Sequence, residues 1–157
     1  MRVYRGTRDA GEAEVEVRNE TPATGDAAAV VGSPWRKLAG RNQVVNHSPD
    51  GFEWGYTGSG PAQLALAILC DHFEHGNDVE LGKEIAKLFG RPVGEGLDDR
   101  KWSEPVQIAT RMYQDFKFKV VSQLDRDVFE LRTPDVSKAL GEMRDALKAG
   151  KRGAVRA

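Results

Sequence analysis

The chain has little of what extracellular, membrane and many catalytic domains depend on. It contains one cysteine, Cys70, and three histidines among 157 residues. One cysteine cannot form an internal disulfide, which favours a reducing compartment. No apolar run approaches membrane-spanning length, and the first residues lack the apolar core of a signal peptide. We therefore predict a cytoplasmic protein without a membrane partner.

Neither sign of charge dominates the composition. Lys and Arg number 23 against 24 Asp and Glu, so the formal net charge is −1. Proteins that attract nucleic acid through their overall field carry an excess of basic residues. Nucleic acid is therefore a disfavoured partner, and only a local basic face would provide for it.

The usual signatures of catalytic and cofactor sites are missing as well. The sequence has neither a phosphate-binding loop with its Lys nor a dinucleotide fingerprint, and it shows no nucleophile beside a base at a recognised spacing. We predict no cofactor and assign no catalytic residue. His72 and His75 are three apart on a predicted helix and could share a face, but no third ligand accompanies them. We therefore predict no metal site.

The most informative stretch, residues 46–73, joins a turn, three aromatics, a glycine-rich bend and an apolar helix. Aromatic residues alternate with others over residues 52–56, which predicts a short strand that anchors Trp54 in the core. Pro61 suits the first turn of a helix, and Gln63 is placed to cap it. The apolar residues that follow surround the helix axis, so we expect a central, buried helix.

A bend separates the predicted strand from the predicted helix, and its residues are Gly58, Ser59 and Gly60. Backbone N–H groups at a helix N-terminus, with the helix dipole, suit an anion or an acidic partner. Candidate acid–base groups lie just before the bend, namely His47, Asp50 and Glu53. The commoner explanation for such glycines is a tight turn that allows close packing.

The block NHSPDGFEWGYTGSGPAQLALAIL resembles the signature of a small uncharacterised prokaryotic family, met in bacteria, archaea, phages and plasmids. Further segments also match, namely RVYRG at residues 2–6, YQDFK at 113–117 and FEL at 129–131. The resemblance implies no known activity and no catalytic residue. The chain departs from the family pattern near 19–41 and 77–104, which look like inserted loops, and it continues beyond residue 131.

These two insertions contain the second group of candidate residues. The candidates for an interaction surface are Trp35, Arg36, Lys37, Arg41, Asp98 and Asp99. A Trp beside three basic residues can grip a nucleic-acid backbone or a protein, and long loops are often functional. The alternative is that these charges form an ordinary solvated rim.

The predicted fold class is α+β, with a small, mainly antiparallel sheet packed on two long helices. The strands are expected in an N-terminal hairpin and at residues 52–56 and 128–132. The long helices are expected over residues 61–75 and 103–124.

An extra C-terminal helix follows, over residues 133–150, and a short surface helix is expected near 79–90. Residues 1–150 form one domain, and 151–157 form a basic, flexible tail. The last helix carries a narrow apolar seam that would pack on the domain or on a second copy, which would make a homodimer.

Two functions follow from these patterns. The favoured one is a non-enzymatic module that binds a protein complex, as an accessory of a mobile element that inhibits a host defence complex of anti-CRISPR or anti-restriction type. Its support is the lack of catalytic motifs and the resemblance to a family met on phages and plasmids. The alternative is a small enzyme or ligand-binding domain that holds a phosphate or carboxylate at residues 58–60.

Overall fold

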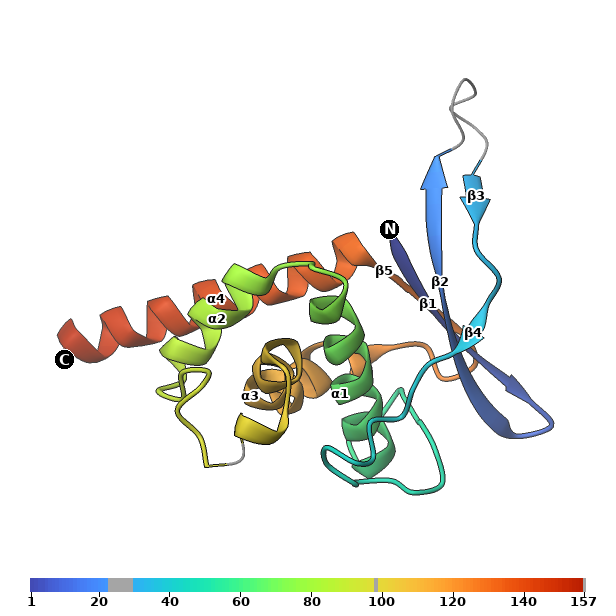
Figure 1. The fold of residues 1–157 in the computed structure, drawn as a ribbon, viewed down its shortest axis with the longest axis horizontal. Coiled ribbons are helices and arrows are strands. Elements are labelled where there is room, and N and C mark those ends of the chain that lie inside the picture. Colours follow the sequence, from blue (N-terminus) through green and yellow to red (C-terminus); the bar gives the residue numbers. More distant parts are fainter. Residues whose placement is uncertain (23–29, 98, 157) are drawn as a thin grey trace.

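A small sheet lies at one side of the molecule and a group of helices at the other (Figure 1). The computed structural model describes residues 1–22, 30–97 and 99–156. Strands and helices occur in one antiparallel sheet and a separate helical layer. The predicted α+β class is therefore confirmed.

The sheet is built on the N-terminal hairpin. β1 (Arg2–Asp9) and β2 (Glu12–Pro22) pair antiparallel along the whole of β1. The residues between them, Ala10 and Gly11, have φ values of 50° and 86°. Positive φ at both positions matches the right-handed twist of a hairpin. β5 (Phe129–Arg132) adds antiparallel to the other edge of β1, which confirms the strand predicted at 128–132.

Two further strands occupy the stretch near 19–41 that we expected to be a loop. β3 (Val30–Gly32) pairs with the end of β2, and β4 (Arg36–Lys37) pairs with Glu16 and Val17. The end of β2 and β3 project from the body as a narrow ribbon (Figure 1). β4 places the preceding Trp35 beside the hairpin.

The strand predicted at residues 52–56 is wrong. This segment pairs with no strand in the described ranges, and Gly51 and Gly55 at either end of it have φ values of 121° and 84°. The Gly55 N–H donates to the carbonyl of Val121 at 3.0 Å, which ties the segment to a turn. Alternation of aromatics correctly indicates burial of Trp54, but positive φ interrupts the extended backbone that a strand requires.

The central helix is confirmed. α1 (Ser59–Glu74) is buried from Gly60 to Phe73 and lies between the sheet and α3 (Glu104–Lys119) (Figure 1). We expected the second long helix to lie against the first, which is confirmed, because α3 packs on α1. We also expected both long helices to cover the sheet, but α1 alone lies between the sheet and α3. A helix that is apolar on all sides needs a second covering layer, and α3 provides it.

The core fills the space between the inner sheet face and α1. The inner face contributes buried residues of three strands, namely Tyr4, Val15, Val17, Phe129 and Leu131. Trp54 is fully buried and meets Phe129 edge to face, with ring centroids 5.0 Å apart. Aromatic pairs favour this arrangement. Trp54 therefore anchors the core as predicted.

α2 (Val79–Leu88) and α4 (Thr133–Arg156) pack together on the side away from the sheet (Figure 1). The apolar seam of α4 is buried within the chain at Val136, Leu140 and Met143. A homodimer through α4 stays a prediction, and it would have to use the other faces of the helix. α4 continues to Arg156, beyond the end that we predicted at residue 150. The flexibility of residues 151–157 stays a prediction, and Ala157 lies outside the described residues.

Two short turns, η1 (Asp99–Lys101) and η2 (Val121–Gln123), flank α3. No helix in the described part of the chain has both the length and the apolar character to cross a membrane.

Candidate functional site

Close packing accounts for one of the two glycines in the bend before α1. Gly58 is the N-cap of α1 and Gly60 lies in its first turn. A Cβ atom on Gly60 would lie 2.6 Å from the Cβ of Glu53, so no side chain fits there. The Glu53 carboxylate pairs with Arg8 at 2.7 Å, so the cation close to the bend already has a partner. An anion site at residues 58–60 stays a prediction.

The three acid–base candidates near the bend have separate surroundings. Nε2 of His47 lies 2.7 Å from the hydroxyl of Tyr113, whereas Glu53 pairs with Arg8. Asp50 is exposed. No hydrogen bond or ion pair joins any two of these three described residues. The structure therefore does not assemble them into one constellation.

Gln63 has a role that the sequence did not indicate. Its side chain is fully buried, and its oxygen accepts the N–H groups of His47 (2.8 Å) and Ser48 (3.2 Å). Its nitrogen donates to the carbonyls of Gly40 (2.7 Å) and Val45 (3.0 Å). It thus holds the 40–48 loop on α1 instead of capping the helix. A Gln inside an apolar helix requires such partners, which is the signal that could have revealed it.

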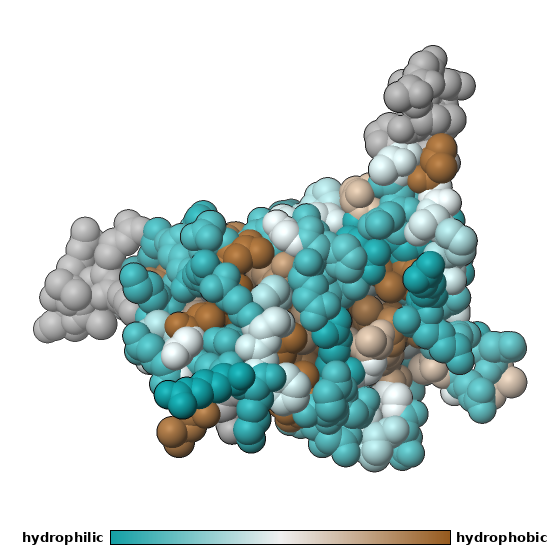
Figure 2. Space-filling model, viewed as in Figure 1, coloured by the Kyte–Doolittle hydropathy of each residue, from teal (hydrophilic) through white to brown (hydrophobic). Residues whose placement is uncertain are grey.

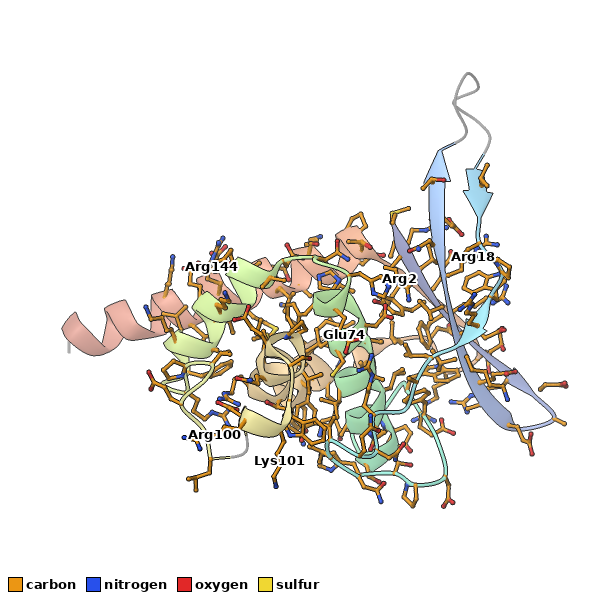
Figure 3. The ribbon with its side chains drawn as sticks, in the orientation of Figure 1. Arg2, Arg18, Glu74, Arg100, Lys101 and Arg144 are labelled. Atoms are coloured by element: carbon orange, nitrogen blue, oxygen red, sulfur yellow. The ribbon has the colours of Figure 1, made fainter. Side chains whose placement is uncertain are left out.

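Trp35 is the centre of a charged surface on the outer side of the sheet. The guanidinium carbons of Arg5 and Arg18 lie over its ring, 3.9 and 4.4 Å from ring centroids. Lys37 on β4 is exposed and pairs with Glu16, which is on the same side of the sheet as Arg5 and Arg18. Arg36 is also exposed, but it pairs with the inward-facing Val17, so its side chain lies on the opposite side. We call Trp35, Arg5, Arg18 and Lys37 the Trp35 face. Figure 3 labels Arg18 on this side of the molecule.

Arg41 does not belong to the Trp35 face, although the sequence grouped it there. Its guanidinium makes two hydrogen bonds, of 2.6 and 2.7 Å, with the carboxylate of Glu74 at the end of α1. Burial raises the pKa of the Cys70 thiol to about 12, so this cysteine is an unreactive core residue.

The carboxylate of Glu20 joins β2 to β5 on the outer side of the sheet. It accepts hydrogen bonds from Arg18 (2.8 Å) and Arg132 (2.8 Å), and Glu20 is only 4% exposed. Burial alone would raise the pKa of Glu20, but the hydrogen bonds and charges of the two arginines outweigh it and lower the pKa. Arg18 therefore serves both this ion pair and the Trp35 face.

The acidic pair predicted as an exposed surface has a different character. Asp98 lies outside the described residues. Asp99 is buried, and its Oδ2 accepts N–H groups from Arg111 (2.6 Å), Gly96 (2.7 Å) and Gly94 (3.0 Å). The hydrogen bond from Arg111 lowers the pKa of Asp99 against the opposing effect of burial. Asp99 organises the segment around it instead of facing a partner.

His72 and His75 each have their own partner. Nε2 of His72 lies 2.7 Å from Asp78, which also accepts a hydrogen bond from Ser137 of α4, at 2.6 Å. Nδ1 of His75 lies 2.7 Å from the carbonyl of Asp71. Burial lowers the pKa of His72, which keeps the imidazole neutral. Within the described ranges, no three His, Cys, Asp or Glu residues are grouped to hold a metal ion.

Asp71 forms a second buried junction that the sequence did not reveal. Its carboxylate accepts two hydrogen bonds from Arg2 (2.9 and 2.7 Å) and one from the hydroxyl of Tyr4 (2.7 Å). Burial and the nearby Asp71 charge raise the pKa of Tyr4, so the phenol stays protonated. These contacts fasten β1 to α1 across 67 residues or more of chain. A charged residue in a buried helix was the available signal.

Comparison with known families places the chain. A family model described as a family of unknown function, DUF6166, matches residues 4–104, which is more than half of the 157 residues. The chain belongs to the DUF6166 family. The match includes the hairpin, Trp35, the bend and α1, whereas almost all of α3, β5 and α4 follow the part that DUF6166 covers. No curated protein and no solved structure matches the chain.

Proposed function

We propose that this DUF6166 protein is a non-catalytic module that binds a protein complex through the Trp35 face. The observation that carries the proposal is the contact of Trp35 with Arg5 and Arg18, beside the exposed Lys37. Trp and Arg are enriched among the residues that dominate binding energy at protein interfaces. A Trp that its neighbours already hold in place loses little side-chain entropy on binding.

Several polar groups that could serve catalysis have partners within the chain, which supports a binding role. Glu53 pairs with Arg8, Asp99 with Arg111, and His72 with Asp78. A general acid or base must be able to reach the proton of a substrate. A substrate would have to displace these internal partners, so a non-catalytic role is the simpler one.

The Trp35 face favours a protein partner of mixed polarity. Three of its four residues are basic, but acidic residues accompany them, because Arg5 pairs with Glu16 (3.0 Å) and Lys37 lies 3.8 Å from Glu14. Figure 2 shows a largely hydrophilic surface on the viewed side, with hydrophobic residues scattered over it. A partner that offers carboxylates around an apolar contact for Trp35 fits this surface.

We further propose that the partner is a host defence complex, and that this protein inhibits it as an accessory of a mobile element. This step is supported by the resemblance of residues 46–69 to a family met on phages and plasmids. The Gly58 bend offers an alternative surface for a carboxylate or phosphate, and the close packing of Gly60 on Glu53 accounts for one of its glycines without a ligand.

Affinity capture from a prokaryotic lysate that contains CRISPR and restriction complexes tests the proposal. The wild-type chain, Trp35→Ala and the control Arg100→Ala are compared with and without nuclease. Arg100 is exposed and lies at the opposite end of the molecule from Arg18 (Figure 3). We expect a nuclease-resistant defence complex with the wild type and Arg100→Ala, and at least about tenfold less of it with Trp35→Ala.

Three results would contradict this function. Equal capture by Trp35→Ala would remove the Trp35 face as the binding surface. Loss of the complex after nuclease treatment would make nucleic acid the bridging partner. A complex unrelated to defence would retain the binding module but refute the inhibitor role.

A further inference from the structure

A cavity of about 510 Å³ lies between the middle of α3, the segment at residues 90–102 and the loop at residues 44–45. Val44, Val45 and Trp102 form an apolar and aromatic wall of this cavity. We call it the Trp102 cavity. Cavities of this volume accommodate small organic ligands. It is separate from the Trp35 face, so the inference below does not rest on the proposed function.

Hydrogen bonds from α3 fix the irregular segment that forms the cavity. The side-chain nitrogen of Gln107 donates to the carbonyls of Asp99 (2.9 Å) and Trp102 (2.8 Å), and its oxygen accepts the Gly94 N–H (2.9 Å). Arg111 donates to the carbonyl of Arg91 at 3.0 Å. A cavity with walls held in this way requires little ordering when a ligand binds.

The charged groups of the cavity balance to zero. Arg91 and Arg111 carry the positive charges, and Glu95 and Asp99 carry the negative ones. Arg111 is already matched, because it pairs with Asp99 Oδ2 at 2.6 Å. Arg91 and Glu95 are both exposed at the rim. A neutral cavity of this kind is unsuited to a phosphate or a polyamine, each of which needs an excess of opposite charge.

One oxygen of Asp99 can accept a donor from the ligand. Asp99 is 6% exposed and lines the cavity, and its Oδ2 takes all three hydrogen bonds that the carboxylate receives from described residues. Its Oδ1 accepts none from them. A carboxylate oxygen without a protein donor has capacity for an N–H group of a ligand.

We propose that the Trp102 cavity binds a small zwitterion with an aromatic or branched apolar side chain, the chemistry of a free amino acid or dipeptide. The ligand ammonium donates to Asp99 Oδ1 and faces Glu95, and the ligand carboxylate accepts from Arg91. The apolar side chain packs on Trp102 and the two valines. The exposed charges of Arg91 and Glu95, the Asp99 oxygen and the apolar wall thus each meet a matching group of a neutral, dipolar ligand.

Titration of the full chain with L-phenylalanine, followed by protein chemical shifts in NMR, tests the proposal. Phenylacetate lacks the ammonium and phenethylamine lacks the carboxylate, so each removes one half of the recognition. We expect saturable shifts of cavity residues with L-phenylalanine, and at least about tenfold weaker binding of either analogue. Adenosine monophosphate, an anionic planar compound, is expected to leave these shifts unchanged.

Two variants locate the site. Arg91→Gln is expected to weaken L-phenylalanine binding at least about tenfold. Arg100→Gln changes a nearby exposed arginine that does not line the cavity and is expected to bind like the wild type. The proposal is overturned if L-phenylalanine and L-leucine both fail to bind at about 10 mM, if phenylacetate binds as well as L-phenylalanine, or if Arg91→Gln leaves the affinity unchanged.

Discussion

Trp54 and Trp35 have similar neighbours and opposite settings. Each ring faces a guanidinium group, that of Arg8 at 4.4 Å for Trp54 and those of Arg5 and Arg18 for Trp35. Trp54 is fully buried, whereas Trp35 is half-buried on the outer side of the sheet. Cation–π contact therefore does not by itself assign a role. Burial makes Trp54 a core residue and leaves part of Trp35 able to contact a partner.

The largest expected difference between the two tryptophans is in how much each contributes to the free energy of unfolding. Trp54→Ala removes a buried ring against Phe129, and we expect the free energy of unfolding to fall by about 3–5 kcal/mol. Trp35→Ala removes exposed cation–π contacts, and we expect a loss of about 1 kcal/mol. Urea unfolding followed by circular dichroism measures both. Equal losses would refute the assignment of Trp54 to the core and Trp35 to a binding surface.

The close packing beside Trp54 should be the next most sensitive feature. Gly60→Ala places a methyl group 2.6 Å from the Cβ and 3.2 Å from the backbone nitrogen of Glu53, the residue before Trp54. We expect a loss of about 1–3 kcal/mol from this overpacking. Differential scanning calorimetry of the single variant measures the loss.

Gly141→Ala is the matched control for Gly60→Ala. Gly141 lies in α4, and a Cβ atom there would meet nothing within 4 Å. We expect a gain of about 0.5–1 kcal/mol, because Ala favours the helix over Gly. If Gly60→Ala behaved like this control, the bend would not approach Glu53 as closely as described. An anion site would then again be an explanation for the glycine.

Local sequence patterns predicted those parts of the fold whose pattern of apolar residues lies within one helix or one hairpin. The apolar surface of α1 indicated a central helix, and the alternation in β1 and β2 indicated the hairpin. The pattern gave a wrong prediction at residues 52–56. Gly51 and Gly55 have positive φ, and the sequence alone does not distinguish such glycines from glycines with the extended φ of a strand. The amphipathic pattern of α3 correctly indicated that it lies against α1, but not that α1 separates it from the sheet.

The candidate site could be predicted only in part, because its contacts join distant segments. Trp35 and Lys37 are two apart in sequence and lie on the same side of the sheet, whereas Arg36 between them lies on the other side. Arg5 and Arg18 join them only through strand pairing, and no spacing rule relates them to Trp35. Asp99 looked like an exposed loop acid, and its burial depends on Arg111, which lies on a helix 12 residues later.

The smallest expected effect is a pH dependence on the side of Trp35. Glu20 has a lowered pKa in the folded protein, so its stabilising contribution is fully present above the unfolded pKa of about 4.3 and is lost as the pH falls through the lower folded pKa. We expect the free energy of unfolding of the wild type to exceed that of Glu20→Gln by at most about 1 kcal/mol, because Arg18 and Arg132 remain partly exposed. Urea unfolding between about pH 3 and pH 7 measures this difference. A difference that stayed constant on acidification would mean that packing, and not the charge of Glu20, holds Arg18 against Trp35.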